Sequence, residues 1–140
     1  ATKGKGKLTK WNQDTRSVTC DCAPMCAFLL DMAVPAIACQ NTASLVNAAS
    51  GLDFTAEDIE KIGERLNNLA RLYNIGAGFT RQDDTFPKRL MTEAIKEGNS
   101  KGQIISQADL DEMLDEYYEA RGWDKNGVPT KEKLEALGLK

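Results

Sequence analysis

Thr55-Ala-Glu-Asp-Ile-Glu-Lys-Ile-Gly-Glu-Arg-Leu-Asn-Asn-Leu-Ala-Arg-Leu-Tyr73 is the stretch that decides the fold. Its apolar residues recur in steps of three and four, which places them on one stripe of an α-helix. They are Ile59, Ile62, Leu66, Leu69 and Tyr73. Thr55 is a typical N-cap, and Glu57 and Asp58 suit the positive end of a helix dipole. Gly76 and Gly78 provide the stop signal. The sequence therefore predicts a long helix here.

Similar signals flank this helix on both sides. On the N-terminal side they predict an apolar helical stretch over Pro24–Ala38, broken near Pro35, and a short helix over Thr42–Ala49. On the C-terminal side, Ser106 caps a helix that ends at Gly122, with Trp123 folding back over its end. After a turn at 124–127, a last short helix follows Pro129-Thr130.

The remaining segments predict loops rather than strands. Residues 79–104 read as a long connector with one helical turn near 88–95, and residues 1–10 read as a flexible Lys/Gly-rich lead. No pair of strands is indicated. The expected fold is all-α, an irregular multi-helix bundle in a single domain over 1–140.

Composition excludes several classes of function. The net charge of −3 disfavours non-specific nucleic-acid binding, which needs a basic surface. The absence of histidine excludes nucleophile–histidine pairs and histidine metal sites. The longest apolar run, Ala27–Ala38, carries Asp31 and Pro35 and is too short to span a bilayer. With no targeting segment either, we expect no membrane partner and a cytoplasmic location.

The four cysteines are Cys20, Cys22, Cys26 and Cys39, all in the first third of the chain. They are too bunched for a disulfide scaffold, which spreads its bridges across a fold. Thiolates bind soft metals and iron–sulfur clusters, but this spacing matches neither a self-contained ferredoxin module nor paired zinc knuckles. For Cys39, on an alanine-rich helix, the favoured interpretation is a small buried hydrophobe. For the cluster around Asp21 the residues leave both interpretations open.

Three long blocks resemble one family in the same order and spacing. They are 51–74 (Gly-Leu-Asp-Phe-Thr … Leu-Tyr-Asn), 78–90 (Gly-Phe-Thr-Arg-Gln-Asp-Asp … Arg-Leu) and 110–124 (Leu-Asp-Glu-Met-Leu … Gly-Trp-Asp). Together they are similar to the C-terminal region of tungsten-dependent aldehyde ferredoxin oxidoreductases, over about residues 5–139. In that family a D-x-x-G-L-C stretch supplies a pterin-contacting aspartate and the fourth cysteine ligand of a 4Fe-4S cluster.

Asp21-Cys-Ala-Pro-Met-Cys26 is similar to that stretch, so the resemblance implies Asp21 as the pterin contact and Cys26 as the cluster ligand. Pro24 stands where glycine is usual and Met25 where leucine is usual. Because proline cannot adopt a positive φ and has no amide hydrogen, Cys22 or Cys20 stand as alternative ligands.

The resemblance also implies a parent enzyme that oxidises aldehydes to carboxylic acids. Electrons would pass from a tungsten (or molybdenum) bis-pterin through the cluster to ferredoxin. This chain would form one wall of the cofactor site and contain no catalytic residue. The N-terminal cofactor-binding domains, with the other three cluster cysteines, are expected before Ala1. The isolated fragment is then expected to be inactive and to hold no cofactor. The competing hypothesis is a self-standing helical interaction module, or a Cys-based metal-binding module, without catalysis.

Overall fold

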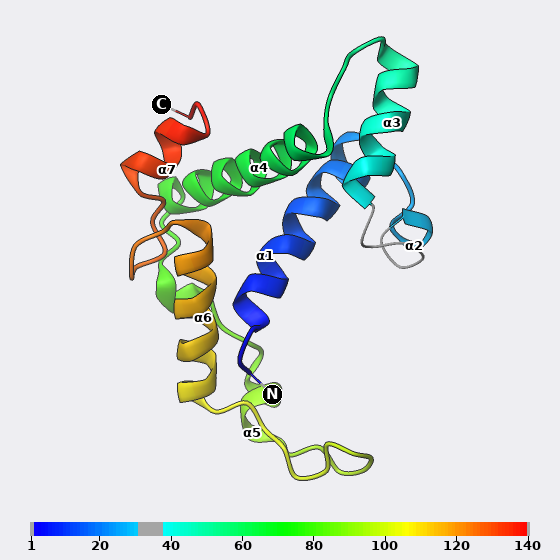
Figure 1. Cartoon of the computed structure of the whole chain (residues 1–140). Coiled ribbons are helices and arrows are strands. Elements are labelled where there is room, and N and C mark those ends of the chain that lie inside the picture. Colours follow the sequence, from blue (N-terminus) through cyan, green and yellow to red (C-terminus); the bar gives the residue numbers. More distant parts are fainter. Residues whose placement is uncertain (1, 31–37, 140) are drawn as a thin grey trace.

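The computed structural model describes residues 2–30 and 38–139 of the chain, and it confirms the all-α fold (Figure 1). The part of the chain that it describes contains no β-strand, only an isolated bridge between Trp123 and Pro129. Its α-helices are α1 Lys5–Arg16, α2 Ala27–Leu30, α3 Ala38–Ser50, α4 Ala56–Gly76, α5 Lys88–Thr92, α6 Gln107–Arg121 and α7 Lys131–Ala136. Among these described residues, no helix is long and apolar enough to cross a membrane.

Helix α4 begins and ends as predicted. Thr55 accepts a hydrogen bond from the Asp58 amide at 3.1 Å, and the Asp58 carboxylate accepts one from the Thr55 amide at 2.9 Å. This reciprocal pair is a capping box that satisfies the free amides of the first turn. The helix ends at Gly76. Helix α1 crosses it near Gly63, and α3 packs near its start (Figure 1).

The apolar stripe of α4 is covered along only half of its length. Ile59 is buried, and Ile62 and Leu66 pack against the same small core. In the second half Leu69 and Tyr73 are 48% and 80% exposed. The residues that α4 buries there are polar, since Asn68 and Arg71 turn towards the C-terminal elements instead.

Helix α1 is a correction to the predicted flexible lead, because residues 5–10 are helical. Its first amides are capped from a distant helix: the Glu116 carboxylate accepts from the Gly4 and Gly6 amides at 3.0 and 2.8 Å. Gly6 allows this approach, because a Cβ there would lie 2.4 Å from the Tyr117 backbone nitrogen. The Lys/Gly-rich start is therefore ordered by α6, on which it packs.

The C-terminal elements follow the sequence signals closely. Ser106 and Asp109 form a capping box at the start of α6, and Gly122 ends the helix at φ 69°. The Trp123 amide then donates to the Tyr118 carbonyl at 2.9 Å, as in a Schellman motif, and Trp123 is buried. Thr130 caps α7. The predicted connector contains α5 and a 3-10 turn, η3 Arg81–Asp83.

Helix α3 starts earlier than the predicted Thr42. Thr42 is not a cap: it is buried within the helix, where its hydroxyl donates to the Ala38 carbonyl at 2.8 Å. Gly51 follows the helix at φ 75°, consistent with the predicted stop. Only α2 represents the predicted Pro24–Ala38 helix among the described residues, and the break expected near Pro35 lies outside them.

Candidate functional site

The chain leaves α1 through a π-helix that carries two of the four cysteines, Cys20 and Cys22. This element, η1 Ser17–Cys22, is followed by backbone hydrogen bonds from Ala23 to the Val18 carbonyl (2.9 Å) and from Met25 to the Thr19 carbonyl (3.0 Å). We call residues 20–26 the thiol segment. Short π-helical turns are frequent at functional sites, where they redirect side chains. The backbone of the thiol segment is thus held against the end of α1.

Within the thiol segment, Asp21, Cys22 and Cys26 are exposed, so both the expected carboxylate and the expected thiol face outward. Cys20 is half-buried, with its sulfur 3.4 Å from the Thr19 hydroxyl oxygen. That hydroxyl already donates its hydrogen to the Thr15 carbonyl at 2.9 Å, so the Cys20 thiol is the donor in this contact. Cys22 and Cys26 are the thiols that a neighbouring body can reach.

Cys39 is buried, unlike the other three thiols. It is buried in the small apolar core with Val18, Ala43 and Ile59, as the sequence predicted. Burial raises the pKa of its thiol, and its sulfur lies 4.0 Å from the Thr15 hydroxyl oxygen. It is a packing residue.

The thiol segment has donors that fit one of the four thiolate ligands of an iron–sulfur cluster. Within residues 2–30 and 38–139, no three Cys, Asp or Glu side chains gather as metal ligands do. A four-iron cluster takes four thiolates, and this segment presents two to the outside. Two outward-facing thiols fit a contribution to a site that another body completes.

Beneath η1 lies a polar network that sequence reasoning missed. The Asn67 side-chain amide on α4 lies 3.0 Å from Asp14 Oδ1, 3.1 Å from Ser17 Oγ and 3.0 Å from the Gly63 carbonyl. Asp14 in turn pairs with Lys10 at 2.9 Å and with Arg121, which is fully buried. An asparagine inside a helix was the one local signal for this network.

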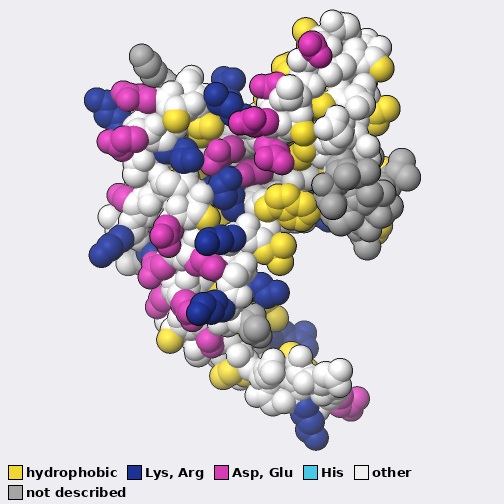
Figure 2. All heavy atoms as spheres, in the orientation of Figure 1, with side chains coloured by type: hydrophobic (Ala, Val, Ile, Leu, Met, Phe, Trp, Pro, Cys, Tyr) yellow, Lys and Arg dark blue, Asp and Glu magenta, His cyan; other side chains and the backbone are white. Residues whose placement is uncertain are grey.

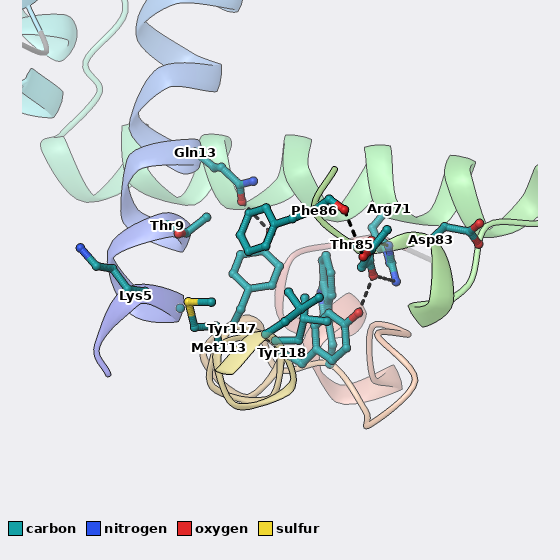
Figure 3. A pocket seen from close by; sticks show the side chains of 15 residues that line it. Lys5, Thr9, Gln13, Arg71, Asp83, Thr85, Phe86, Met113, Tyr117 and Tyr118 are labelled. Carbon is teal, nitrogen blue, oxygen red and sulfur yellow. Dashed lines mark hydrogen bonds and ion pairs between the residues drawn. The ribbon is translucent and has the colours of Figure 1, made fainter. Parts of the chain in front are cut away.

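A cavity of about 450 Å³ opens between α1, α6 and the connector (Figure 3). On one side Arg71 pairs with both oxygens of Asp84, at 2.9 and 2.7 Å, and the Tyr118 hydroxyl donates to Asp84. Burial, together with this bond, raises the pKa of Tyr118, so its phenol keeps its proton. On the other side the Tyr117 hydroxyl donates to Gln13 at 2.6 Å. These polar groups form hydrogen bonds with one another. Their contacts link α6 to α1 and, through the connector, to α4.

The fold and the thiol segment together define an all-α domain that displays two thiols and a carboxylate on its surface. The chain belongs to the family described as "Aldehyde ferredoxin oxidoreductase, domains 2 & 3", whose pattern matches residues 1–139. The resemblance found in the sequence is thereby confirmed.

Individual relatives agree with this assignment. The tungsten-containing aldehyde ferredoxin oxidoreductase of Pyrococcus horikoshii is 39% identical over 136 residues, 96% of this chain and 21% of that protein. The one of Pyrococcus furiosus is 51% identical over 96 residues, 68% of this chain and 15% of that protein. This chain thus spans about a fifth or less of the length of these relatives.

A solved structure shares the fold as well. It is the active site complex BamBC of benzoyl coenzyme A reductase with 1,5-dienoyl-CoA, matched with a TM-score of 0.58 and 31% identity. The match covers 72% of this chain and 14% of the other.

Proposed function

We propose that this chain is the C-terminal part of a tungstopterin and iron–sulfur oxidoreductase. The parent oxidises aldehydes to carboxylic acids with ferredoxin as electron acceptor, and this chain contributes one wall of the cofactor site and one cluster ligand. The observation that carries the proposal is the outward-facing thiol segment in a chain of this family. Its partners are the N-terminal cofactor-binding domains of the same protein, and ferredoxin.

Two side chains carry the proposed roles. The Cys26 thiolate holds one iron of the 4Fe-4S cluster, because it is exposed at the end of the ordered segment. The Asp21 carboxylate accepts hydrogen bonds from the N–H groups of the pterin, since an ionised carboxylate only accepts. When bound, the tungstopterin and the cluster supply the oxidation and the electron transfer, and the protein supplies binding and orientation. Cys22, also exposed, is the alternative thiolate.

The test compares cysteine variants of the full-length parent enzyme. Cys26→Ala, Cys22→Ala and Cys20→Ala are purified, and iron and sulfide are counted alongside the EPR spectrum of the reduced cluster. Alanine is used because a serine oxygen could itself bind iron. We expect Cys26→Ala to lose the four-iron signal and the other two variants to keep it.

Other outcomes have defined meanings. Loss in Cys22→Ala instead would move the ligand to Cys22 and leave the role of the segment intact. A full complement of iron in all three variants would contradict the proposal that a cysteine of the thiol segment is a cluster ligand. Asp21→Asn is expected to lower pterin and tungsten content while leaving cluster iron unchanged.

A further inference from the structure

We propose that Asn67 is a positioning residue for the thiol segment: its amide ties the first residue of η1 to α4 and to Asp14, and so fixes where the exposed thiols point. The inference rests on the proposed function, in which this segment holds one corner of a cluster. It assigns a role to a side chain that lies on another helix and touches no cysteine.

The geometry places Asn67 at the joint between α1 and η1. Its two amide protons face three acceptors at 3.0–3.1 Å: Asp14 Oδ1 near the end of α1, Ser17 Oγ at the start of η1, and the Gly63 carbonyl of α4 itself. Gly63 is also where α1 meets α4, because a Cβ there would lie 2.1 Å from the Asp14 carbonyl oxygen. Asn67 therefore holds the point where the chain turns from α1 into the segment.

The anchor below Asn67 is rigid. Asp14 is only 6% exposed and is held by Arg121 of α6, whose side chain is fully buried. Arg121 also donates to Gln13 at 2.8 Å. Hydrogen bonds between charged groups are stronger in such a shielded setting than in water. The Asn67 amide therefore links Ser17, at the start of η1, to an Asp14 side chain that Arg121 of α6 holds in place.

The segment above Ser17 is held in turn by backbone contacts. Thr19 is fully buried, its hydroxyl donates to the Thr15 carbonyl at 2.9 Å, and its carbonyl accepts from the Met25 amide at 3.0 Å. Met25 is the neighbour of Cys26 in the chain. A shift at Ser17 is therefore passed through Thr19 to the exposed thiol. Groups that hydrogen-bond a metal ligand directly typically change metal affinity or activity 10–100-fold when removed, and Asn67, which acts at one remove, is expected to give an effect at the low end of that range.

Asn68 provides a matched control on the same helix. Both asparagines bond the backbone carbonyl four residues earlier, Asn67 to Gly63 at 3.0 Å and Asn68 to Glu64 at 2.8 Å. The Asn68 side-chain oxygen instead accepts from Trp123 Nε1 at 2.8 Å, in the C-terminal elements. Substituting Asn68 removes a similarly bonded but more deeply buried amide, whose side-chain partners lie in α4 and the C-terminal elements and not in η1.

The experiment uses the full-length holoenzyme with Asn67→Leu and Asn68→Leu. Iron release to a ferrous chelator and the EPR spectrum of the reduced cluster are measured, with thermal unfolding alongside. We expect both variants to unfold at lower temperature, but only Asn67→Leu to release iron about tenfold faster. Only that variant should show an altered EPR line shape.

Equal iron release and equal spectra in the two variants would overturn the positioning role and leave Asn67 with a purely structural one. Should Asn67→Leu fail to fold, Ser17→Ala removes only the hydroxyl that accepts from Asn67. The positioning role then predicts faster iron release for Ser17→Ala than for Asn68→Leu, and equal release would overturn it. The proposed function fails separately, if the cysteine variants described above all retain their cluster.

Discussion

At the scale of single residues, two arginines are buried in ion pairs with aspartates. Arg121 is fully buried against Asp14, and Arg71 is buried against Asp84 with both terminal guanidinium nitrogens engaged. Among the described residues, no buried side-chain nitrogen or oxygen lacks a hydrogen-bond partner. Such pairs are well tolerated when every group is satisfied, and removing one member leaves the other uncompensated.

Arg121→Ala is therefore expected to be severely destabilising. Removing one partner of a buried ion pair costs about 3–5 kcal/mol, because the remaining charge is stranded away from water. Here the remaining group is Asp14, which keeps Lys10 and the Asn67 amide but loses its buried cation, and Tyr117 and Gln13 each lose one donor. The measurement is urea unfolding of the 140-residue chain. Arg89→Ala, which removes an exposed pair with Glu93, is the control and should barely move the midpoint. Equal midpoints for the two variants would show that the buried pair is not a determinant of stability.

At the scale of elements, α4 is the helix on which the others converge. Its N-terminal half contacts α3 and the apolar core, its middle crosses α1 at Gly63, and its polar C-terminal half meets Trp123 and Gly127 through Asn68 and Arg71. The crossing brings two backbones together and depends on the absence of a side chain at one position.

Two glycines of α4 test this crossing. Gly63→Ala would place a Cβ against the Asp14 carbonyl oxygen, a backbone atom that cannot swing away. We expect a loss of at least about 1–3 kcal/mol, as for other overpacked sites. Gly76→Ala has open space around it, and its expected effect is neutral or a gain of up to about 1 kcal/mol. Both are read from chemical denaturation of the chain. A Gly63→Ala variant as stable as the parent chain would mean that the helices cross elsewhere.

At this scale the sequence predicted well the features that depend on residues close together in the chain. The ends of α4 and α6 follow from caps that lie within four residues of their partners. Helix α1 was missed because its capping carboxylate, Glu116, is 110 residues away and its residues form no apolar stripe. Likewise the thiols could be found from composition, but the support of the thiol segment could not, since Asn67 and Asp14 are 53 positions apart.

At the scale of the whole molecule, part of the exposed apolar surface lies on the elements that adjoin the thiol segment. Phe28 of α2 is 75% exposed, Leu45 of α3 is 52% exposed and Leu52 just beyond α3 is 53% exposed, while η1 contacts both α2 and α3. Hydrophobic side chains gather over α3, and charged ones gather over α4, α6 and α7 (Figure 2). An exposed apolar surface next to outward-facing ligands is typical of a face that another body covers. In the proposed parent, that body is the rest of the enzyme.

Thiol labelling compares that face between the isolated chain and the full-length parent. In the isolated chain, iodoacetamide should modify Cys22 and Cys26 fastest and Cys39 slowest, because burial both hides the Cys39 sulfur and raises its pKa, which lowers the thiolate fraction. In the holoenzyme Cys26 should become protected, since coordination to iron lowers the nucleophilicity of a thiolate sulfur and the covering domains shield it from the reagent. Peptide mass spectrometry after timed quenching gives each rate. Cys39 is the internal control, slow in both samples. If Cys26 is modified equally fast in both, the thiol segment stays open to solvent in the parent, and its place in the cofactor wall is wrong.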